Sequence, residues 1–395
     1  MQAWQSVVGR GRRRPRDLLY HPPVPVQPTI PGLDVAPSAL PVLGLTFVEC
    51  VEALRSRGVS RERAVKAYRG VFRSGVCESD HLRLPHPPLV AEHEEGLTRK
   101  FVLRHADGLE TESVLIPMHR GGLLNAYHTY TLCVSSQVGC AMGCRFCETA
   151  QMGLMRNLTP EEIVAQWFAA RHHFGTQVKN IVFMGMGEPM DNLDAVLQAV
   201  RVLADSNGAG IGPANIAIST VGRLDGIARL GEFVRQPGFR RLNLAVSVNA
   251  PNDEVRSSIM PINRAAPMAA LREALLAWPM RRGGAFCIEY VLIPGVNDRP
   301  EHCDELCAWL QPLRCSLNVI PYNPRRESPW PAPTEESVDA FVARAVAHGQ
   351  FVKRRQTKGR SMMGACGQLG NPGIRRRRLV DAGDPHTLTI RGVPS

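Results

Sequence analysis

The sequence lacks any long uninterrupted run of apolar residues. A helix that crosses a bilayer needs about 20 apolar residues in succession, and the apolar runs of this 395-residue chain are shorter. Five arginines lie between residues 10 and 16 without the apolar stretch that follows such charges in a secretory signal. We therefore expect neither a membrane-spanning nor a secreted protein, and we expect the chain to act in the cytoplasm.

The composition indicates a folded protein with a large core. A length of 395 residues allows one large barrel or two to three domains, and a hydrophobic content of 44% allows a sizeable core. The 11 cysteines include a cluster with metal-binding spacing rather than the pattern of a disulfide scaffold. Such usage favours a reducing compartment.

Positive charge is concentrated at the two ends of the chain. The net charge is +11, of which residues 1–20 contribute +4 and residues 371–395 contribute +3. Basic segments suit the phosphates of a nucleic acid, because they release counterions on binding. A solvated tail without a partner is the alternative that composition leaves open.

Three cysteines lie within eight residues, in Cys140-Ala-Met-Gly-Cys144-Arg-Phe-Cys147. Three thiolates can hold three irons of a cubic 4Fe-4S cluster, and the fourth iron could then bind a small chelating molecule. Zinc would need a fourth Cys or His nearby, and none follows at ligand spacing. Three buried thiols without a metal are the plainer alternative.

Two further motifs accompany this triplet. Cys133-Val-Ser-Ser-Gln-Val-Gly precedes it directly, and Gly364-Ala-Cys366-Gly-Gln-Leu369 lies far downstream. With them, the chain from about residue 112 to residue 369 resembles the RNA adenosine methyltransferases of the radical S-adenosylmethionine (SAM) superfamily. One branch of that family methylates carbon 2 of adenine in ribosomal and transfer RNA, and a sister branch methylates carbon 8.

The resemblance implies one 4Fe-4S cluster and two molecules of SAM per turnover. The cluster ligands would be Cys140, Cys144 and Cys147. The implied SAM contacts are Gly187, Glu188, Ser219, Ser247, Val248, Asn249 and Asn323. The family has Leu-His where this chain has Val248-Asn249, and Asn can keep a hydrogen bond there.

The resemblance also implies the route of the methyl group. One SAM would methylate Cys366 to S-methylcysteine, and the cluster would cleave a second SAM reductively to a radical that takes a hydrogen from that methyl. The resulting carbon radical would add to the base, and Cys133 would remove the ring proton before a transient disulfide forms with Cys366. Glu112 matches a family proton acceptor.

The resemblance further implies RNA as substrate, an electron donor such as flavodoxin or ferredoxin, and a monomer. A radical SAM enzyme with C8 selectivity or another substrate stays open. An RNA-binding protein with a structural cluster is an alternative of another class. Cys133 and Cys366 argue against it, because binding alone requires neither.

A regular alternation of strands and helices begins at residue 131. The strands are expected at 131–136, 180–185, 215–220, 242–248, 285–292 and 316–321. The helices are expected at 159–174, 191–204, 224–234, 267–278, 300–311 and 334–348. Six such units predict a parallel sheet with crossover helices. This is the open (β/α)6 partial TIM barrel of radical SAM enzymes, with its chemistry at the C-terminal strand ends.

The expected domain organisation has five parts. Residues 1–40 form a basic, proline-rich and disordered lead-in, and residues 41–100 form a small N-terminal helical accessory domain. Residues 101–130 contain a hairpin and an inserted loop. The radical SAM core spans 131–350, and residues 351–395 carry the loop of Cys366 and a basic tail.

Overall fold

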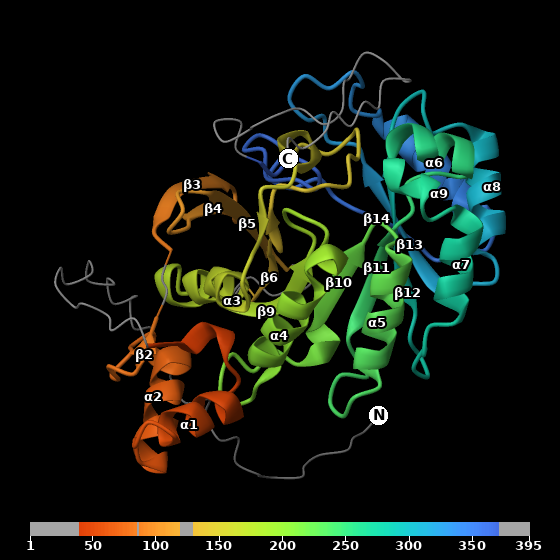
Figure 1. The fold of residues 1–395 in the computed structure, drawn as a ribbon. Helices are drawn as coiled ribbons and strands as arrows, with labels where there is room; N and C mark the ends of the chain where they lie inside the picture. The colour runs from red at the N-terminus through yellow and green to blue at the C-terminus, as the bar shows by residue number, and fades with distance from the viewer. Residues whose placement is uncertain (1–38, 85–86, 119–128, 371–395) are drawn as a thin grey trace, which may run out of the picture.

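A ten-stranded sheet runs through the computed structural model, which describes residues 39–84, 87–118 and 129–370 (Figure 1). The strand order is β14-β13-β12-β11-β10-β9-β6-β5-β4-β3. The strands of this sheet are β3 (Leu89–Glu95), β4 (Thr98–Arg104), β5 (Glu110–Pro117), β6 (Thr129–Cys133), β9 (Gln177–Phe183), β10 (Ile216–Thr220), β11 (Asn243–Ser247), β12 (Phe286–Leu292), β13 (Cys315–Pro321) and β14 (Val352–Arg354). The short pairs are β1 (Leu40–Pro41) with β2 (Leu82–Arg83), and β7 (Gln137–Val138) with β8 (Arg156–Asn157).

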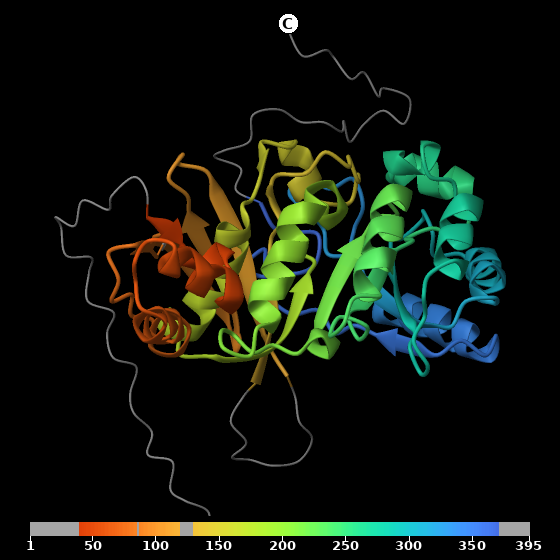
Figure 2. The same cartoon turned by 60° about the horizontal axis from the view of Figure 1, so that its bottom comes forward.

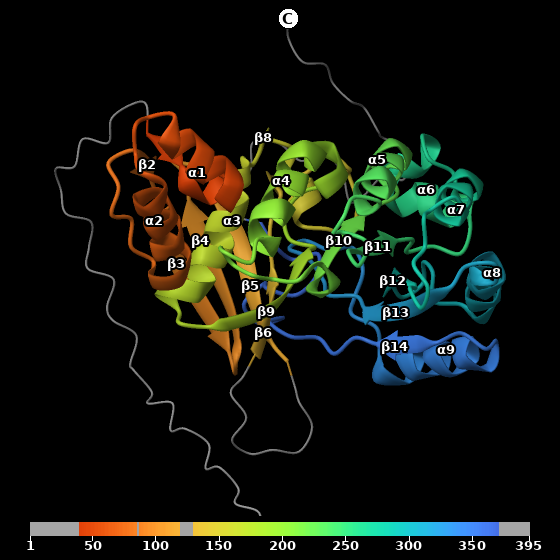
Figure 3. The same ribbon diagram turned by 90° about the horizontal axis from the view of Figure 1, so that it is seen from below.

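Helices α3 to α9 connect the parallel strands and cover the outer side of the sheet, whereas α1 and α2 precede the strands of this sheet. The helices are α1 (Phe47–Arg55), α2 (Arg61–Ser74), α3 (Pro160–Phe168), α4 (Leu193–Ala204), α5 (Leu224–Val234), α6 (Asp253–Ile259), α7 (Met268–Leu276), α8 (Pro300–Leu310) and α9 (Glu335–Ala347). Seen from below, the strands form an open arc with α4 and α5 on its outer side (Figure 3). The predicted open (β/α)6 partial barrel is therefore confirmed.

Local sequence explains where the first barrel helix begins. Thr159 and Glu162 form a capping box at α3, with Pro160 in its first turn, and this arrangement satisfies free N–H groups at the helix start. The helix ends at Phe168 and continues as a π-helical turn to His173. The structure therefore confirms the helix predicted at 159–174, and its C-terminal turn is π-helical instead of α-helical.

The parallel and antiparallel parts of the sheet meet at β6. Strands β6 and β9 to β14 pair in parallel, and β14 extends the six predicted strands by a seventh. On the other side of β6, the strands β5, β4 and β3 pair antiparallel. The predicted hairpin is β4 and β5, and β3 adds a third strand to it.

The expectation of a helical region over 41–100 is wrong in its second half. The second helix, α2, ends at Ser74, whereas β3 begins at Leu89. Strand β3 carries three glutamates and a histidine in its last four residues, and four of its seven residues are exposed, since it is an edge strand with one neighbour. Its composition therefore hides the strand from a pattern of apolar residues.

The N-terminal helices share one hydrophobic core with the barrel. Phe72 of α2 stacks on Trp167 of α3 at 5.8 Å between ring centroids. The backbone N–H of Phe47 donates to Asp205, beyond the end of α4, at 2.7 Å. Figure 2 shows α1 and α2 lying against the first part of the barrel.

Several predictions fall on residues that lie outside the described part of the chain. They are the lead-in up to residue 38, most of the inserted loop (119–128), and the basic tail from residue 371. Within the described ranges, no helix is both long enough and apolar enough to span a membrane.

Candidate active site

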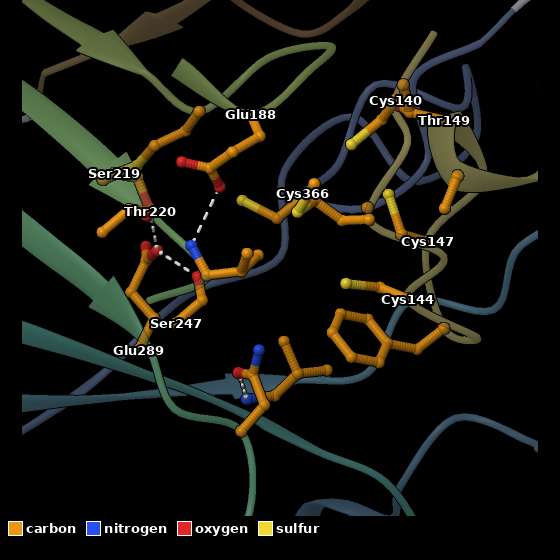
Figure 4. Close-up of a pocket in the computed structure, with 18 of the residues that line it drawn as sticks. Cys140, Cys144, Cys147, Thr149, Glu188, Ser219, Thr220, Ser247, Glu289 and Cys366 are labelled. Atoms are coloured by element: carbon orange, nitrogen blue, oxygen red, sulfur yellow. Dashed lines mark hydrogen bonds between the residues drawn. The ribbon is translucent and has the colours of Figure 1, made fainter. Parts of the chain in front are cut away.

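Two adjoining cavities lie at the C-terminal ends of the barrel strands. The first is lined by the cysteine loop and by the ends of β9, β10, β11 and β12 (Figure 4). The second, of about 670 Å³, lies between β5, β6 and β9 on one side and the segment after β14 on the other. This volume is typical of a pocket for a small ligand or a nucleotide. Cys366 lines both cavities.

The three cysteines of the triplet lie in the loop between β7 and β8. Figure 4 shows the thiols of Cys140, Cys144 and Cys147 turned toward one common space. Burial raises the pKa of all three thiols, and neighbouring thiols raise the pKa of Cys140 and Cys144 further. Such thiols are stabilised as thiolates when a cationic metal centre binds them.

Glycine shapes the entry to this loop. Gly139 has a φ of 76°, and a Cβ placed there would lie 1.7 Å from the carbonyl oxygen of Gly153. Because no side chain fits, the loop can fold back on itself. The N–H of Cys140 then donates to the same carbonyl at 3.1 Å.

The donor set fits a cluster better than a single ion. In the part of the chain that the structure describes, no three His, Cys, Asp or Glu side chains converge as ligands of one metal ion. Thiolates on one tetrahedral zinc would lie about 3.8 Å apart, given Zn–S bonds of about 2.3 Å. A cubic cluster holds each thiolate on a different iron, so its ligands stand further apart around a common space. The three thiols face one common space and could each bind a different iron, so the three cysteines fit a 4Fe-4S cluster.

Glu188 is held in the wall of the first cavity by backbone groups. Its carboxylate accepts the N–H of Met190 at 3.1 Å and that of Val221 at 2.9 Å. Burial raises the pKa of Glu188 to about 7, while the N–H group of Val221 lowers it. An ammonium or amine group in this cavity would find a buried carboxylate that lies in a fixed position.

Two serines and a glutamate form a second polar group in this cavity. Glu289 of β12 accepts the hydroxyl of Ser219 at 3.0 Å and that of Ser247 at 3.1 Å. The two serines were predicted, but Glu289 was missed. Its strand has the sequence Phe-Cys-Ile-Glu-Tyr-Val-Leu. A single acidic residue within an apolar strand could have indicated a functional side chain, because a buried carboxylate requires polar partners.

The other predicted SAM contacts divide between different environments. Asn249 lines the first cavity, and its amide oxygen accepts the N–H of Val291 at 2.9 Å. The side chain of Val248 is fully buried in the core. Asn323 lines the second cavity, where its amide oxygen accepts Arg360 at 3.1 Å.

The two cysteines predicted to act on the substrate both line the second cavity. Cys133 ends β6 and is buried, whereas Cys366 is exposed to the cavity space. Burial and the nearby Cys366 raise the pKa of Cys133, and Arg355 lowers it. Desolvation by the cavity walls raises the pKa of the Cys366 thiol, and the positive charge of Arg355 lowers it.

Arg355 is a site residue that sequence reasoning missed. It follows β14, lines the second cavity, and its pKa is raised chiefly by Cys366. Lys353, Arg354 and Lys358 line the same cavity, and among the described residues that line it none is an aspartate or a glutamate. The run Lys-Arg-Arg, which forms the end of β14 and the residue after it, was the available signal.

Glu112 lies beside these cavities rather than in their lining. Its carboxylate forms a buried ion pair with Lys100 at 3.3 Å and accepts the N–H of Gly370 at 3.1 Å. Its predicted role as a proton acceptor stays a prediction.

A partial barrel whose first βα loop carries three converging cysteines defines the radical SAM class of enzymes. The model of the Radical SAM superfamily matches residues 134–307. The superfamily implies a 4Fe-4S cluster and SAM. A radical SAM methyltransferase from Sphaerobacter thermophilus is similar in structure, with a TM-score of 0.76 and 37% identity over 83% of this chain and 98% of that one.

Sequence relatives then identify the family within this class. The probable dual-specificity RNA methyltransferase RlmN 1 of Protochlamydia amoebophila is 45% identical over 74% of this chain and 78% of its own length. The dual-specificity RNA methyltransferase RlmN of Syntrophus aciditrophicus is 37% identical over 82% of this chain and 89% of its own. The chain belongs to the RlmN family of radical SAM RNA methyltransferases.

Proposed function

We propose that this RNA methyltransferase methylates carbon 2 of an adenosine in ribosomal and transfer RNA, with S-methylcysteine at Cys366 as the intermediate. One observation carries the proposal. Cys366 stands where the two cavities adjoin, with the cysteine triplet in the first and Cys133 in the second. A methyl carrier must face its donor and its acceptor in turn, and this position faces both.

The residues of the first cavity would hold the cluster and SAM. Cys140, Cys144 and Cys147 would bind three irons, and Glu188 would accept hydrogen bonds from the amino group of SAM. When bound, the cluster supplies the electron for reductive cleavage of SAM, and two SAM molecules are consumed per turnover. Ser219 and Ser247 would then bind the sugar, with their hydroxyl groups oriented by Glu289.

The second cavity would receive the adenosine. Its cationic wall suits a polyanion, because positive charge near the entrance attracts phosphates. Arg355 would favour the thiolates of both Cys366 and Cys133. Cys366 needs the thiolate to accept a methyl group, and Cys133 needs it to remove the ring proton.

Two kinds of RNA substrate are inferred from the relatives, which are named as dual-specificity RNA methyltransferases, and carbon 2 is inferred from the family resemblance of the motifs. A C8-methylating enzyme is the alternative. Mass spectrometry of nucleosides from the RNA of a deletion strain distinguishes the two, because 2-methyladenosine and 8-methyladenosine separate chromatographically. We further infer a flavodoxin or ferredoxin as electron donor, a monomer, and a cytoplasmic location.

The intermediate is tested with two cysteine variants. Cys133→Ala should still methylate Cys366 and add it to the base, but it should not release the product. The variant should therefore accumulate a covalent protein–RNA adduct. On a denaturing gel this adduct should migrate more slowly than the free protein, and nuclease digestion of the RNA should make it migrate faster. Cys366→Ala should form no adduct, because no carbon is attached to the protein.

The double variant is the control. It should behave like Cys366→Ala, since the earlier step is blocked. If both single variants lose activity and neither traps RNA, the proposed intermediate is wrong. RNA binding without any methylation by the wild-type enzyme would instead favour a binding protein with a structural cluster.

A further inference from the structure

The segment that carries Cys366 crosses from one edge of the sheet to the other. It leaves β14, which is one edge strand, and reaches β3, which is the opposite edge strand. In Figure 3 the blue C-terminal segment runs from β14 back toward β6. Its contacts with β3, β4 and β5 bring together residues that are more than 240 positions apart in the chain.

Glu95, at the turn between β3 and β4, holds the start of this segment. Its carboxylate accepts the N–H of Gly359 at 2.8 Å and both the N–H, at 2.9 Å, and the hydroxyl of Ser361. Hydrogen bonds from Ser361 and Gly359 lower the pKa of Glu95. A carboxylate that accepts three donors from one loop fixes the path of that loop.

Lys100, on β4, holds the next part. Its ammonium group is buried, pairs with Glu112, and donates to the carbonyl of Met363 at 3.3 Å. Met363 has a φ of 53°, a conformation that a side-chain-bearing residue rarely adopts and that its surroundings must stabilise. Cys366 follows three residues later.

The other end of the segment is tied to the cysteine loop. The N–H of Glu148 donates to Gly367 at 2.7 Å, and the hydroxyl of Thr149 donates to Leu369 at 2.6 Å. Cys366 therefore lies between an anchor on the cluster loop and an anchor on the hairpin. The thiol itself remains exposed to the cavity.

We propose that Glu95 and Lys100 are positioning residues for the methyl carrier. They hold residues 359–363 so that the thiol of Cys366 stays on the wall between the two cavities. Neither Glu95 nor Lys100 is among the described residues that line the two cavities, and the proposed reaction assigns no chemical step to either. The inference rests on the proposed function, because it assigns Cys366 the task for which position matters.

The decisive variant is Glu95→Gln, with Glu94→Gln as its matched control. Glu94 is the preceding residue on the same strand and pairs with Arg99 instead of the loop. A misplacement of about 1 Å can reduce a rate about 100-fold. We expect Glu95→Gln to lower kcat at least about tenfold while the KM for SAM changes less than about twofold, and Glu94→Gln to match the wild type.

A readout separate from turnover distinguishes positioning from general destabilisation. Iodoacetamide labelling of Cys366, followed by mass spectrometry of its peptide, should differ at least about threefold between Glu95→Gln and the wild type at a temperature where both are folded. Ser361→Ala removes one donor from the loop side and should shift the same rate in the same direction by less. It serves as the test if Glu95→Gln does not fold. Lys100→Arg, which keeps the charge, should retain more activity than Lys100→Met.

Two failures are separable. If the wild-type enzyme carries no methyl group on Cys366, the proposed function is wrong. If it does, and Glu95→Gln matches Glu94→Gln in both kcat and labelling rate, the hairpin does not position the carrier and the inference is overturned.

Discussion

Replacing Gly187 by alanine tests how the first cavity is built. Gly187 has a φ of 99°, and a Cβ there would lie 2.6 Å from the Cβ of Gln137 and 2.9 Å from its backbone nitrogen. The same Gln137 side chain accepts the N–H of Glu188 at 2.8 Å. The added methyl group must therefore displace the residue that holds the predicted SAM contact.

The cost follows from two effects. A positive φ costs a residue with a Cβ about 1–2 kcal/mol, and overpacking a rigid neighbour costs about 1–3 kcal/mol. We expect Gly187→Ala to reduce the free energy of unfolding by about 2–5 kcal/mol and to weaken SAM binding more than about tenfold. Thermal unfolding of the apoprotein measures the first effect, and equilibrium dialysis with labelled SAM on the reconstituted enzyme measures the second.

Gly210→Ala separates conformational strain from collision. Gly210 has a φ of 68°, but a Cβ there would meet no atom within 4 Å. This variant should lose about 1–2 kcal/mol of stability and bind SAM as the wild type does. Equal stability of the two variants, together with unchanged SAM affinity in Gly187→Ala, would refute the collision with Gln137.

Three further predictions concern the cluster, the tails and the thiolate. Replacing any one cysteine ligand in the 140–147 loop by alanine should abolish the brown absorbance and the approximately four irons per chain obtained on anaerobic reconstitution; clusters that survive all three changes contradict the ligand assignment. Removing residues 1–16 or 371–395 should weaken RNA binding and flatten its salt dependence, whereas unchanged affinity at low salt indicates solvated arms. Arg355→Gln removes the charge that lowers the pKa of Cys366, so the thiolate fraction at a given pH falls and the midpoint of Cys366 alkylation moves to higher pH; an unmoved midpoint shows that Arg355 does not act on the thiol.

Short-range patterns were sufficient to predict the barrel and the cysteine loop. Strand and helix boundaries followed from apolar runs and from caps such as Thr159, because these depend on neighbouring residues. The predicted cluster ligands lie within eight residues, so their spacing indicates a common centre. The edge strand β3 was not predicted, because its charged residues interrupt the apolar alternation by which a strand is recognised.

The assembly of the substrate side depends on contacts that no local pattern contains. Cys133 and Cys366 could be paired in advance only through resemblance, and Glu95, Glu289 and Arg355 were not singled out. Each of these three residues interacts with a group on a distant element. Glu95 accepts a loop amide, Glu289 accepts two serine hydroxyls, and Arg355 lies near the thiol of Cys366.

The sequence by itself determined that a parallel barrel forms, and its cysteine spacing predicted which residues would bind the cluster. Both predictions depend on patterns that extend over a few residues, namely the periodicity of apolar residues and the spacing of the cysteines, and both patterns are visible in the sequence. Only the tertiary structure decided that Asn323 lies in the second cavity, that Val248 faces the core, and that the segment of Cys366 crosses to the hairpin. These outcomes depend on how strands far apart in sequence pack side by side, which fixes the direction of each side chain only once the sheet is complete.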